Sequence, residues 1–287
     1  MKRDEFSDAA LVLLGHGTTQ NEGSAAPVYQ HASEIRRQNI FAQVREAFWK
    51  QEPRVVEVLS QVVSRHIFVV PLFMSEGYFS EEAIPRELGF RGPGDKSWSR
   101  RSGTGEKSIF YCKPIGTHER MSEVVLARAR EIVATSGGQA AIPAETTLLV
   151  AGHGTEKNEN SRKSIAGQVS LIREKRLYAA VHAIFLEEEP RIQSWHAFAR
   201  TQHVIIVPFF SSDGLHTQED IPILLGMSEE EVRQRIKSRQ PVWQNPTEIN
   251  GKTVWYTASV GTAGEVSEII LERVREAREE KQAGVME

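Results

Sequence analysis

Leu11-Val-Leu-Leu-Gly-His-Gly-Thr18 returns later in the chain as Leu148-Leu-Val-Ala-Gly-His-Gly-Thr155. The first glycines of the two copies are 137 positions apart (152 − 15), and the same offset carries Pro53 to Pro190. A repeat of this length is longer than the unit of a solenoid protein. It indicates a duplicated domain, and it allows the two copies to be compared side chain by side chain.

The length of the chain agrees with two domains. Its 287 residues are enough to build two separate hydrophobic cores. Residues 134–145 are rich in Gly, Ala, Ser and Pro, a composition typical of a linker. We therefore expect an N-terminal domain at residues 1–140 and a C-terminal domain at residues 141–287.

The charge and the cysteine content exclude several classes of protein. The chain has 35 Lys and Arg against 38 Asp and Glu, a net charge of −3, which provides no basic field for nucleic acid or an anionic membrane. Cys112 is the only cysteine, so no intrachain disulfide can form and a cytoplasmic location is expected. The apolar run at residues 9–14 is too short for a signal peptide core or a membrane span.

The fold class follows from the order of apolar segments in each half. The runs before Gly-His-Gly, and those at residues 67–73 and 204–210, lack polar alternation, as expected for strands buried on both faces. Helical spacing of apolar residues lies between them, for example over residues 165–172. Strands that alternate with helices predict an α/β fold. We expect two tandem doubly wound domains, each with a mostly parallel four-stranded sheet flanked by helices.

One segment of the first half has no equivalent length in the second. Residues 91–107 are rich in Gly and Ser and carry Arg91, Lys96, Arg100, Arg101 and Lys107. We interpret this segment first as a solvated loop. The alternative is a lid that holds the carboxylates of an acidic ligand.

Three candidate metal-binding side chains follow three strands of the second half. His153 comes directly after the first strand, Glu187 ends the second, and His216 lies just beyond the third. Because ligands bind beyond the carboxyl ends of strands in an open α/β sheet, these side chains can converge on one point. Two imidazoles and a carboxylate suit Fe, Co, Ni or Zn, and they can also accept protons near neutral pH. Asp220 is placed to orient His216.

The first half has lost this set. Its Gly-His-Gly histidine, His16, is present, but Phe79 occupies the position of His216 and Lys50 that of Glu187. Ala83 replaces Asp220. Phenylalanine cannot bind a metal ion and lysine would repel one, so we expect a competent second half and a degenerate first half. His16 then has a mainly structural role.

The motifs of the second half resemble the CbiX family of sirohydrochlorin cobaltochelatases, which are class II tetrapyrrole chelatases. The motifs are Gly152-His-Gly-Thr155, Phe185-Leu-Glu187 and Gly214-Leu-His-x-x-x-Asp-Ile-Pro222. The resemblance extends over nearly all of both halves. It implies two fused CbiX-like, chelatase-like domains with the tetrapyrrole held in a cleft between lobes. It also implies that His153 and His216 bind the metal and that Glu187 is an assisting acid. His118 matches a further family motif that the second half lacks.

The resulting hypothesis is a lyase-type metal chelatase with His153, His216 and Glu187 as its catalytic residues. The divalent ion, Co²⁺, Fe²⁺ or Ni²⁺, is a substrate, and no organic cofactor is expected. The partner is a sirohydrochlorin-like tetrapyrrole of cobalamin or siroheme biosynthesis, and the protein is a monomer or homodimer. Backbone N–H groups at helix starts can hold carboxylates of the ring. Ser161, Arg162 and Lys163 could do the same, or could simply begin a helix.

Two other functions remain open. A metallochaperone or tetrapyrrole carrier on a chelatase fold would use the same ligands without catalysis. A histidine-dependent phosphatase is suggested by the likeness of Gly-His-Gly to an Arg-His-Gly motif. Leu14 and Ala151 stand where that arginine would be, which argues against the phosphatase.

Overall fold

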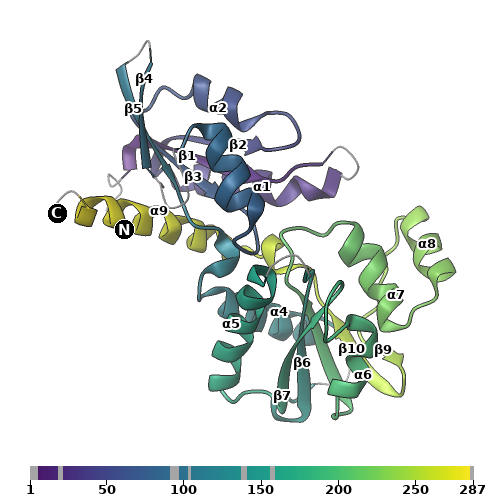
Figure 1. Ribbon diagram of the computed structural model, residues 1–287. Helices are drawn as coiled ribbons and strands as arrows, with labels where there is room; N and C mark the ends of the chain where they lie inside the picture. Colours follow the sequence, from purple (N-terminus) through teal and green to yellow (C-terminus); the bar gives the residue numbers. More distant parts are fainter. Residues whose placement is uncertain are drawn as a thin grey trace. The chain divides into compact units, whose positions relative to one another are not determined.

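The computed structural model describes residues 6–18, 22–90, 97–102, 105–136, 141–155 and 159–284. The chain forms two compact units (Figure 1). Unit 1 contains residues 1–118 and 264–287, and unit 2 contains residues 119–263. The chain therefore passes from unit 1 to unit 2 and returns to unit 1 near its end.

Unit 1 is built on a five-stranded sheet with the order β2-β1-β3-β5-β4. The first four strands in this order run parallel, and β4 runs antiparallel to β5. The parallel strands carry the expected runs of branched and aromatic residues, which are buried because helices cover the sheet. The strands are β1 (Phe6–Gly15), β2 (Phe41–Phe48), β3 (His66–Pro71), β4 (Ser97–Ser102) and β5 (Gly105–Tyr111).

The helices of unit 1 cover both faces of this sheet. Val12 and Leu14 of β1 belong to one core cluster with residues of α2 and α3. Leu11 and Leu13, which alternate with them and so face the other side, are fully buried as well. On that side α1 and α9 contact the strands and each other. The helices are α1 (Ala26–Gln38), α2 (Val55–Gln61), α3 (Ile84–Leu88) and α9 (Val266–Gly284).

Unit 2 repeats the architecture with the strand order β7-β6-β8-β10-β9. Its four parallel strands and the antiparallel edge strand β9 match those of unit 1 one for one. The strands are β6 (Thr146–Gly152), β7 (Ala180–Phe185), β8 (His203–Pro208), β9 (Thr247–Ile249) and β10 (Lys252–Tyr256). The helices are α4 (Met121–Thr135), α5 (Asn160–Glu174), α6 (Trp195–Phe198), α7 (Ile221–Leu225) and α8 (Glu229–Lys237). Within the described ranges, no helix combines the length and apolar character needed to cross a bilayer.

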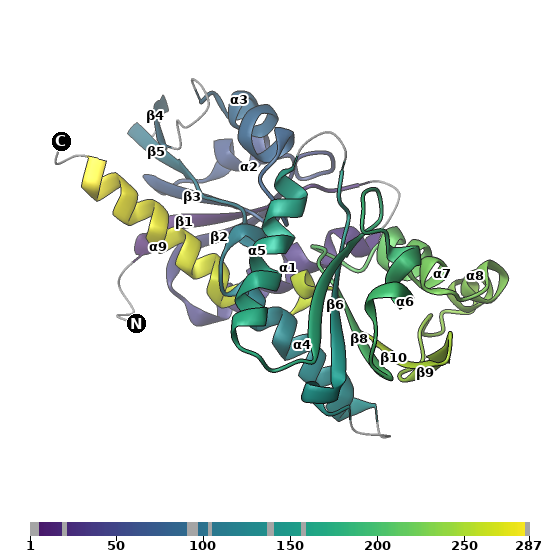
Figure 2. The ribbon, with the colours of Figure 1, turned by 60° about the horizontal axis from the view of Figure 1, so that its bottom comes forward.

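The last helix of each sequence repeat packs in the other unit. The first repeat ends in α4, which contacts α5 and β8 of unit 2, and the second ends in α9, which contacts β3 of unit 1 (Figures 1 and 2). Equivalent arginines fasten the two helices: Arg128 donates to Thr262 Oγ1 at 2.6 Å, and Arg273 donates to Thr117 Oγ1 at 2.8 Å. The halves 1–140 and 141–287 follow the sequence repeat. The compact units differ from them because each unit contains the last helix of the other repeat.

The predicted α/β fold is confirmed, with a fifth strand added to each sheet. The expectation of a loop is wrong where the structure describes residues 91–107, because β4 and the start of β5 form an antiparallel hairpin. Lys107 is buried, and its Nζ donates to the carbonyl oxygen of Val62. This lysine therefore supports the hairpin and does not face a ligand. Residues 91–96, including Arg91 and Lys96, lie outside the described residues.

Candidate metal site

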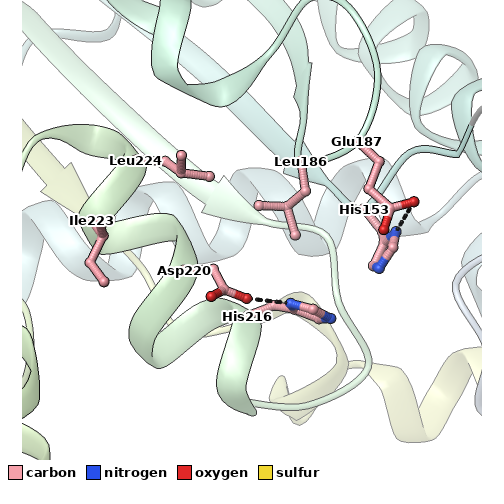
Figure 3. A pocket seen from close by; sticks show the side chains of 7 residues that line it. All are labelled: His153, Leu186, Glu187, His216, Asp220, Ile223 and Leu224. Atoms are coloured by element: carbon pink, nitrogen blue, oxygen red, sulfur yellow. Dashed lines mark hydrogen bonds and ion pairs between the residues drawn. The ribbon is translucent and has the colours of Figure 1, made fainter. Parts of the chain in front are cut away.

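A cavity of about 320 Å³ lies in unit 2 (Figure 3). The three side chains predicted from the sequence all line it, although they follow three different strands. His153 follows β6, Glu187 follows β7, and His216 lies beyond β8. The complete lining is His153, Leu186, Glu187, His216, Asp220, Ile223 and Leu224.

The Gly-His-Gly loop presents His153 to the cavity. Gly154 has φ +69°, a left-handed conformation that favours glycine. A Cβ atom on Gly152 would lie 1.9 Å from Cδ1 of Ile165, so a larger residue here would require the Ile165 side chain to move. His153 Nδ1 lies 2.7 Å from the carbonyl oxygen of Gly154. A carbonyl only accepts, so Nδ1 carries the proton and a neutral His153 keeps the lone pair of Nε2 for a ligand.

His216 is held in the same tautomer by a carboxylate. It begins a single π-helical turn that ends at Asp220, and its Nδ1 lies 2.6 Å from Asp220 Oδ2 (Figure 3). Such a contact orients the imidazole and leaves its other nitrogen, Nε2, without the proton. The turn is fixed from beneath by Tyr256, whose hydroxyl donates to Thr217 O at 2.8 Å. Burial, and the nearby Asp213 charge, raise the pKa of Tyr256 well above its usual range, so this donor stays protonated.

The two histidine rings lie close together at an angle that suits a shared ligand. Their centroids are 5.0 Å apart and their planes meet at 83°. Among the residues that the structure describes, no three His, Cys, Asp or Glu side chains are grouped as a set of metal ligands. An ion in this cavity would therefore meet two imidazole nitrogens and would keep its other coordination positions open. An open site of this kind suits an ion that is passed on better than an ion that is kept.

The structure distinguishes three consecutive glutamates that the sequence leaves ambiguous. Glu187 lines the cavity, with 56% of its side chain exposed and Oε2 3.8 Å from His153 Nδ1. Glu188 instead supports the loop, because it accepts from the backbone N–H of Thr155 at 3.2 Å and from Arg162 Nε at 2.7 Å. Glu189 turns away and accepts from the backbone N–H of Arg191. Glu187 is the acid placed beside the histidines.

The basic side chains at the start of α5, which the sequence suggests as partners for carboxylates of the ring, already pair with groups of the protein itself. Arg162 contacts Glu188 and the carbonyl oxygen of Glu189. Lys163 pairs with Glu159 at 3.0 Å. Their structural interpretation, as residues that begin α5 and hold the loop, agrees with these contacts.

Sequence reasoning missed the apolar wall of the cavity. Leu186, Ile223 and Leu224 line it together with the polar groups (Figure 3). Leu186 and Leu224 also pack on the hydrophobic core cluster of unit 2. Leu186 comes directly before Glu187, and the other two follow the Asp-Ile-Pro motif, so their positions in the chain were the available signal. A wall of this kind suits a ligand with an apolar face.

The equivalent position in unit 1 has different chemistry. The His16 ring lies 5.6 Å from the Trp49 ring and 5.5 Å from the Phe79 ring, measured between centroids. Desolvation of the ring, and to a smaller extent the Lys50 charge, lowers the pKa of His16 below its ordinary value. The two carboxylates that line the unit 2 cavity are Glu187 and Asp220. Their counterparts in unit 1 are Lys50 and Ala83, neither of which is acidic.

His118 is not part of the cavity in unit 2. It is buried in unit 1, with Nε2 3.3 Å from Glu272 Oε2 and 3.4 Å from Glu276 Oε1. Both glutamates belong to α9. His118 therefore helps to hold α9 in unit 1.

Comparison with known proteins finds similarity over most of the chain. The family model described as CbiX matches residues 10–132 and again residues 147–277. A probable sirohydrochlorin cobaltochelatase of Halobacterium salinarum is 40% identical over 278 residues, which cover 93% of this chain and 91% of the relative.

Two solved structures extend the comparison to the fold. A multi-domain protein of Deinococcus radiodurans, described as structurally similar to chelatases, has a TM-score of 0.71 and 25% identity over 92% of this chain. The chain spans 54% of that larger protein. SirB from Bacillus subtilis, solved with Fe³⁺, has a TM-score of 0.64 and 19% identity, with 94% of this chain and 95% of SirB covered.

Proposed function

The chain belongs to the CbiX family, and we propose that it is a metal chelatase that inserts a divalent ion into sirohydrochlorin. One observation carries the proposal: His153 and His216 lie in one cavity with both Nδ1 atoms hydrogen-bonded, so both Nε2 atoms are available to an ion. The name of the relative from Halobacterium salinarum supports sirohydrochlorin as the tetrapyrrole and Co²⁺ as the ion. The reaction fits cobalamin or siroheme biosynthesis.

The chemistry of insertion requires an exchange of charge. One divalent ion enters the ring, four ring nitrogens bind it, and two pyrrole protons leave. The Nε2 lone pairs of His153 and His216 first hold the ion beside the ring. As the ring nitrogens replace them, each imidazole is free to accept a proton, a role that histidine fills near neutral pH.

The two carboxylates beside the histidines have separate roles in this scheme. Asp220 accepts from His216 Nδ1 and so stabilises the positive charge that develops when Nε2 takes a proton. Glu187 is more exposed and lies next to His153, where it can pass protons to solvent. It also adds negative charge that attracts a divalent cation. Glu187 is therefore an assisting acid–base group in this scheme.

The choice of ion rests on ligand type. Imidazole nitrogens suit Co²⁺, Fe²⁺ and Ni²⁺, and their order of affinity does not by itself select one. SirB, which has this fold, has been solved with Fe³⁺. We propose Co²⁺ as the preferred ion because the relative from Halobacterium salinarum is named as a probable cobaltochelatase. Organic cofactors are not required by the scheme.

The decisive experiment is an absorbance assay of metal insertion. Metal-free sirohydrochlorin is mixed with Co²⁺, Fe²⁺ or Ni²⁺, with and without the protein, and the change of the ring spectrum is followed. We expect acceleration over the spontaneous rate, greatest with Co²⁺. The double variant His153→Ala/His216→Ala is the control and should return the rate to the spontaneous value. Tight binding of ion and ring without acceleration would overturn the enzyme and support a carrier.

The remaining expectations about the protein stay predictions. We propose that it acts in the cytoplasm, as a monomer or homodimer, with the tetrapyrrole as its partner and without nucleic acid. A measurement of mass in solution by light scattering would decide between the two oligomeric states.

A further inference from the structure

The degenerate position in unit 1 is occupied by a group of side chains that we call the aromatic cluster: His16, Trp49, Lys50, Phe73 and Phe79. The Trp49 and Phe79 rings are 4.7 Å apart between centroids. Lys50 Nζ lies 4.9 Å from the Trp49 centroid and 5.4 Å from the Phe79 centroid. Four rings and one cation therefore meet where the other repeat carries its metal-site residues.

The cluster leaves aromatic surface exposed. Phe79 is 40% exposed and the adjacent Tyr78 is 53% exposed, whereas large rings are usually buried. Trp49 is half-buried at the edge of the core cluster of unit 1. A single exposed ring is ordinary, but adjoining rings beside a lysine combine the two features that planar anionic ligands require, a π surface and a positive charge.

The cluster is held in place before any ligand arrives. The backbone N–H of Trp49 donates to Gly15 O at 3.1 Å, and that of Lys50 donates to His16 O at 2.9 Å. Trp49 Nε1 donates to Glu87 Oε2 at 2.8 Å, which fixes the plane of the indole. A site whose rings are already oriented loses less entropy when it binds a rigid ligand.

His16 presents an acceptor to this surface. Its Nδ1 lies 2.9 Å from Gly17 O and so carries the ring proton. The lowered pKa, caused first by desolvation and then by Lys50, keeps the imidazole neutral at pH 7. Nε2 has a lone pair and no partner among the described residues. It can accept a hydrogen bond from an N–H group, which a protonated histidine could not do.

We propose that the aromatic cluster is a stacking site for the tetrapyrrole ring. Phe79 takes the π face of the macrocycle, and Trp49, whose plane is tilted by 49° from that of Phe79, contacts the edge of the macrocycle. Lys50 pairs with one of its peripheral carboxylates, and His16 Nε2 accepts from a pyrrole N–H. The identity of the ligand rests on the proposed function, while the stacking site rests on the geometry of unit 1. The loss of the metal ligands from the first repeat would then reflect a change from holding an ion to holding a ring.

The test measures binding of metal-free sirohydrochlorin in the absence of any ion. In Phe79→Leu the side chain stays apolar but loses its π face, and we expect Kd to rise about tenfold, the lower part of the range for one stacked ring. Tyr29→Leu is the matched control, because Tyr29 is an exposed aromatic residue of unit 1 outside the cluster. Its Kd should equal that of the unaltered protein. Circular dichroism and Co²⁺ binding should be unchanged in both variants.

A second variant separates the charge from the ring. Lys50→Gln should weaken binding of sirohydrochlorin and also reduce the dependence of Kd on salt, since one ion pair is lost. If Phe79→Leu and Lys50→Gln both bind as tightly as the unaltered protein, the stacking site is wrong while the chelatase proposal stands. If the unaltered protein does not bind sirohydrochlorin at all, both proposals fall.

Discussion

The loops after β1 and β6 have the same backbone and opposite chemistry. Gly17 and Gly154 have φ +72° and +69°. His16 and His153 each place Nδ1 near the next glycine carbonyl, at 2.9 and 2.7 Å. The last residues of the neighbouring strands β2 and β7 also make equivalent backbone hydrogen bonds. Phe48 N–H donates to Pro53 O and Phe185 N–H donates to Pro190 O, both at 2.9 Å. The glycines and the backbone bonds thus hold the histidine alike in both units.

The difference lies in the side chains that surround the histidine. His153 has a carboxylate beside it and a second imidazole 5.0 Å away. His16 has aromatic rings and a lysine, which together lower its pKa. The comparison teaches that this loop positions an imidazole but does not decide what the imidazole does. The side chains at three neighbouring positions differ between the units: Lys50, Phe79 and Ala83 in unit 1 against Glu187, His216 and Asp220 in unit 2.

The largest expected effect is the contrast between the two histidines of the repeat. His153→Ala removes an ion ligand and proton acceptor, and the chelation rate should fall about 100-fold or more. His16→Ala leaves both ligands of unit 2 in place, and the rate should fall only a few-fold. Initial rates of cobalt insertion into sirohydrochlorin measure both, with circular dichroism as the check on folding. Equal losses in the two variants would show that the units are not specialised in this way.

A second prediction attempts to convert unit 1 into a copy of unit 2. Phe79→His alone should not create a second metal site, because Lys50 still repels a cation and Ala83 cannot fix the new imidazole. The triple variant Phe79→His/Lys50→Glu/Ala83→Asp restores all three positions and should bind one additional Co²⁺. Cobalt stoichiometry by calorimetry, with anomalous diffraction to locate the ions, tests both. A second bound ion in the single variant would contradict the prediction.

The smallest expected effect concerns the electrostatics of His16. Lys50 is positive and disfavours the imidazolium, so Lys50→Gln should raise the pKa of His16. The pKa should stay below the ordinary value of 6.5, since desolvation is the larger cause of the shift. Titration of the imidazole nitrogens by NMR measures this, with Lys113→Gln as the control because Lys113 pairs with Glu280 elsewhere in unit 1. An unchanged pKa in Lys50→Gln would mean that solvent screens the lysine.

The last helices of the two repeats, α4 and α9, show what a sequence pattern does not predict. The apolar faces of α4 and α9 are visible in the sequence, and buried Val124, Val125 and Ile269 confirm them. Such a pattern predicts that one face is covered, but not by which sheet. The contacts of α4 with β8 and of α9 with β3, together with the hydrogen bonds of Arg128 and Arg273, show which pairing the fold uses.

Other misses have equally local reasons. The edge strand β9 has a weak signal because it is only 3 residues long and none of its side chains is fully buried. Trp195 and Trp255 are buried core residues, but Trp49 is only half-buried. Its place beside Phe79 depends on two segments that are 30 positions apart (79 − 49). The aromatic cluster was therefore hidden from a reading of either segment alone.

By itself the sequence determined the duplication, the α/β class and the inequality of the two repeats. These follow from composition and spacing: glycines permit the sharp turn, apolar runs build strands, and a phenylalanine or lysine cannot replace a metal ligand. The tertiary structure alone decided which glutamate faces His153, which nitrogen of each histidine is available, and which sheet each last helix covers. The glutamate and the sheet depend on distances between residues far apart in the chain, and the nitrogen depends on the direction in which each imidazole points toward a near neighbour. A pattern of residue types contains neither distances nor directions.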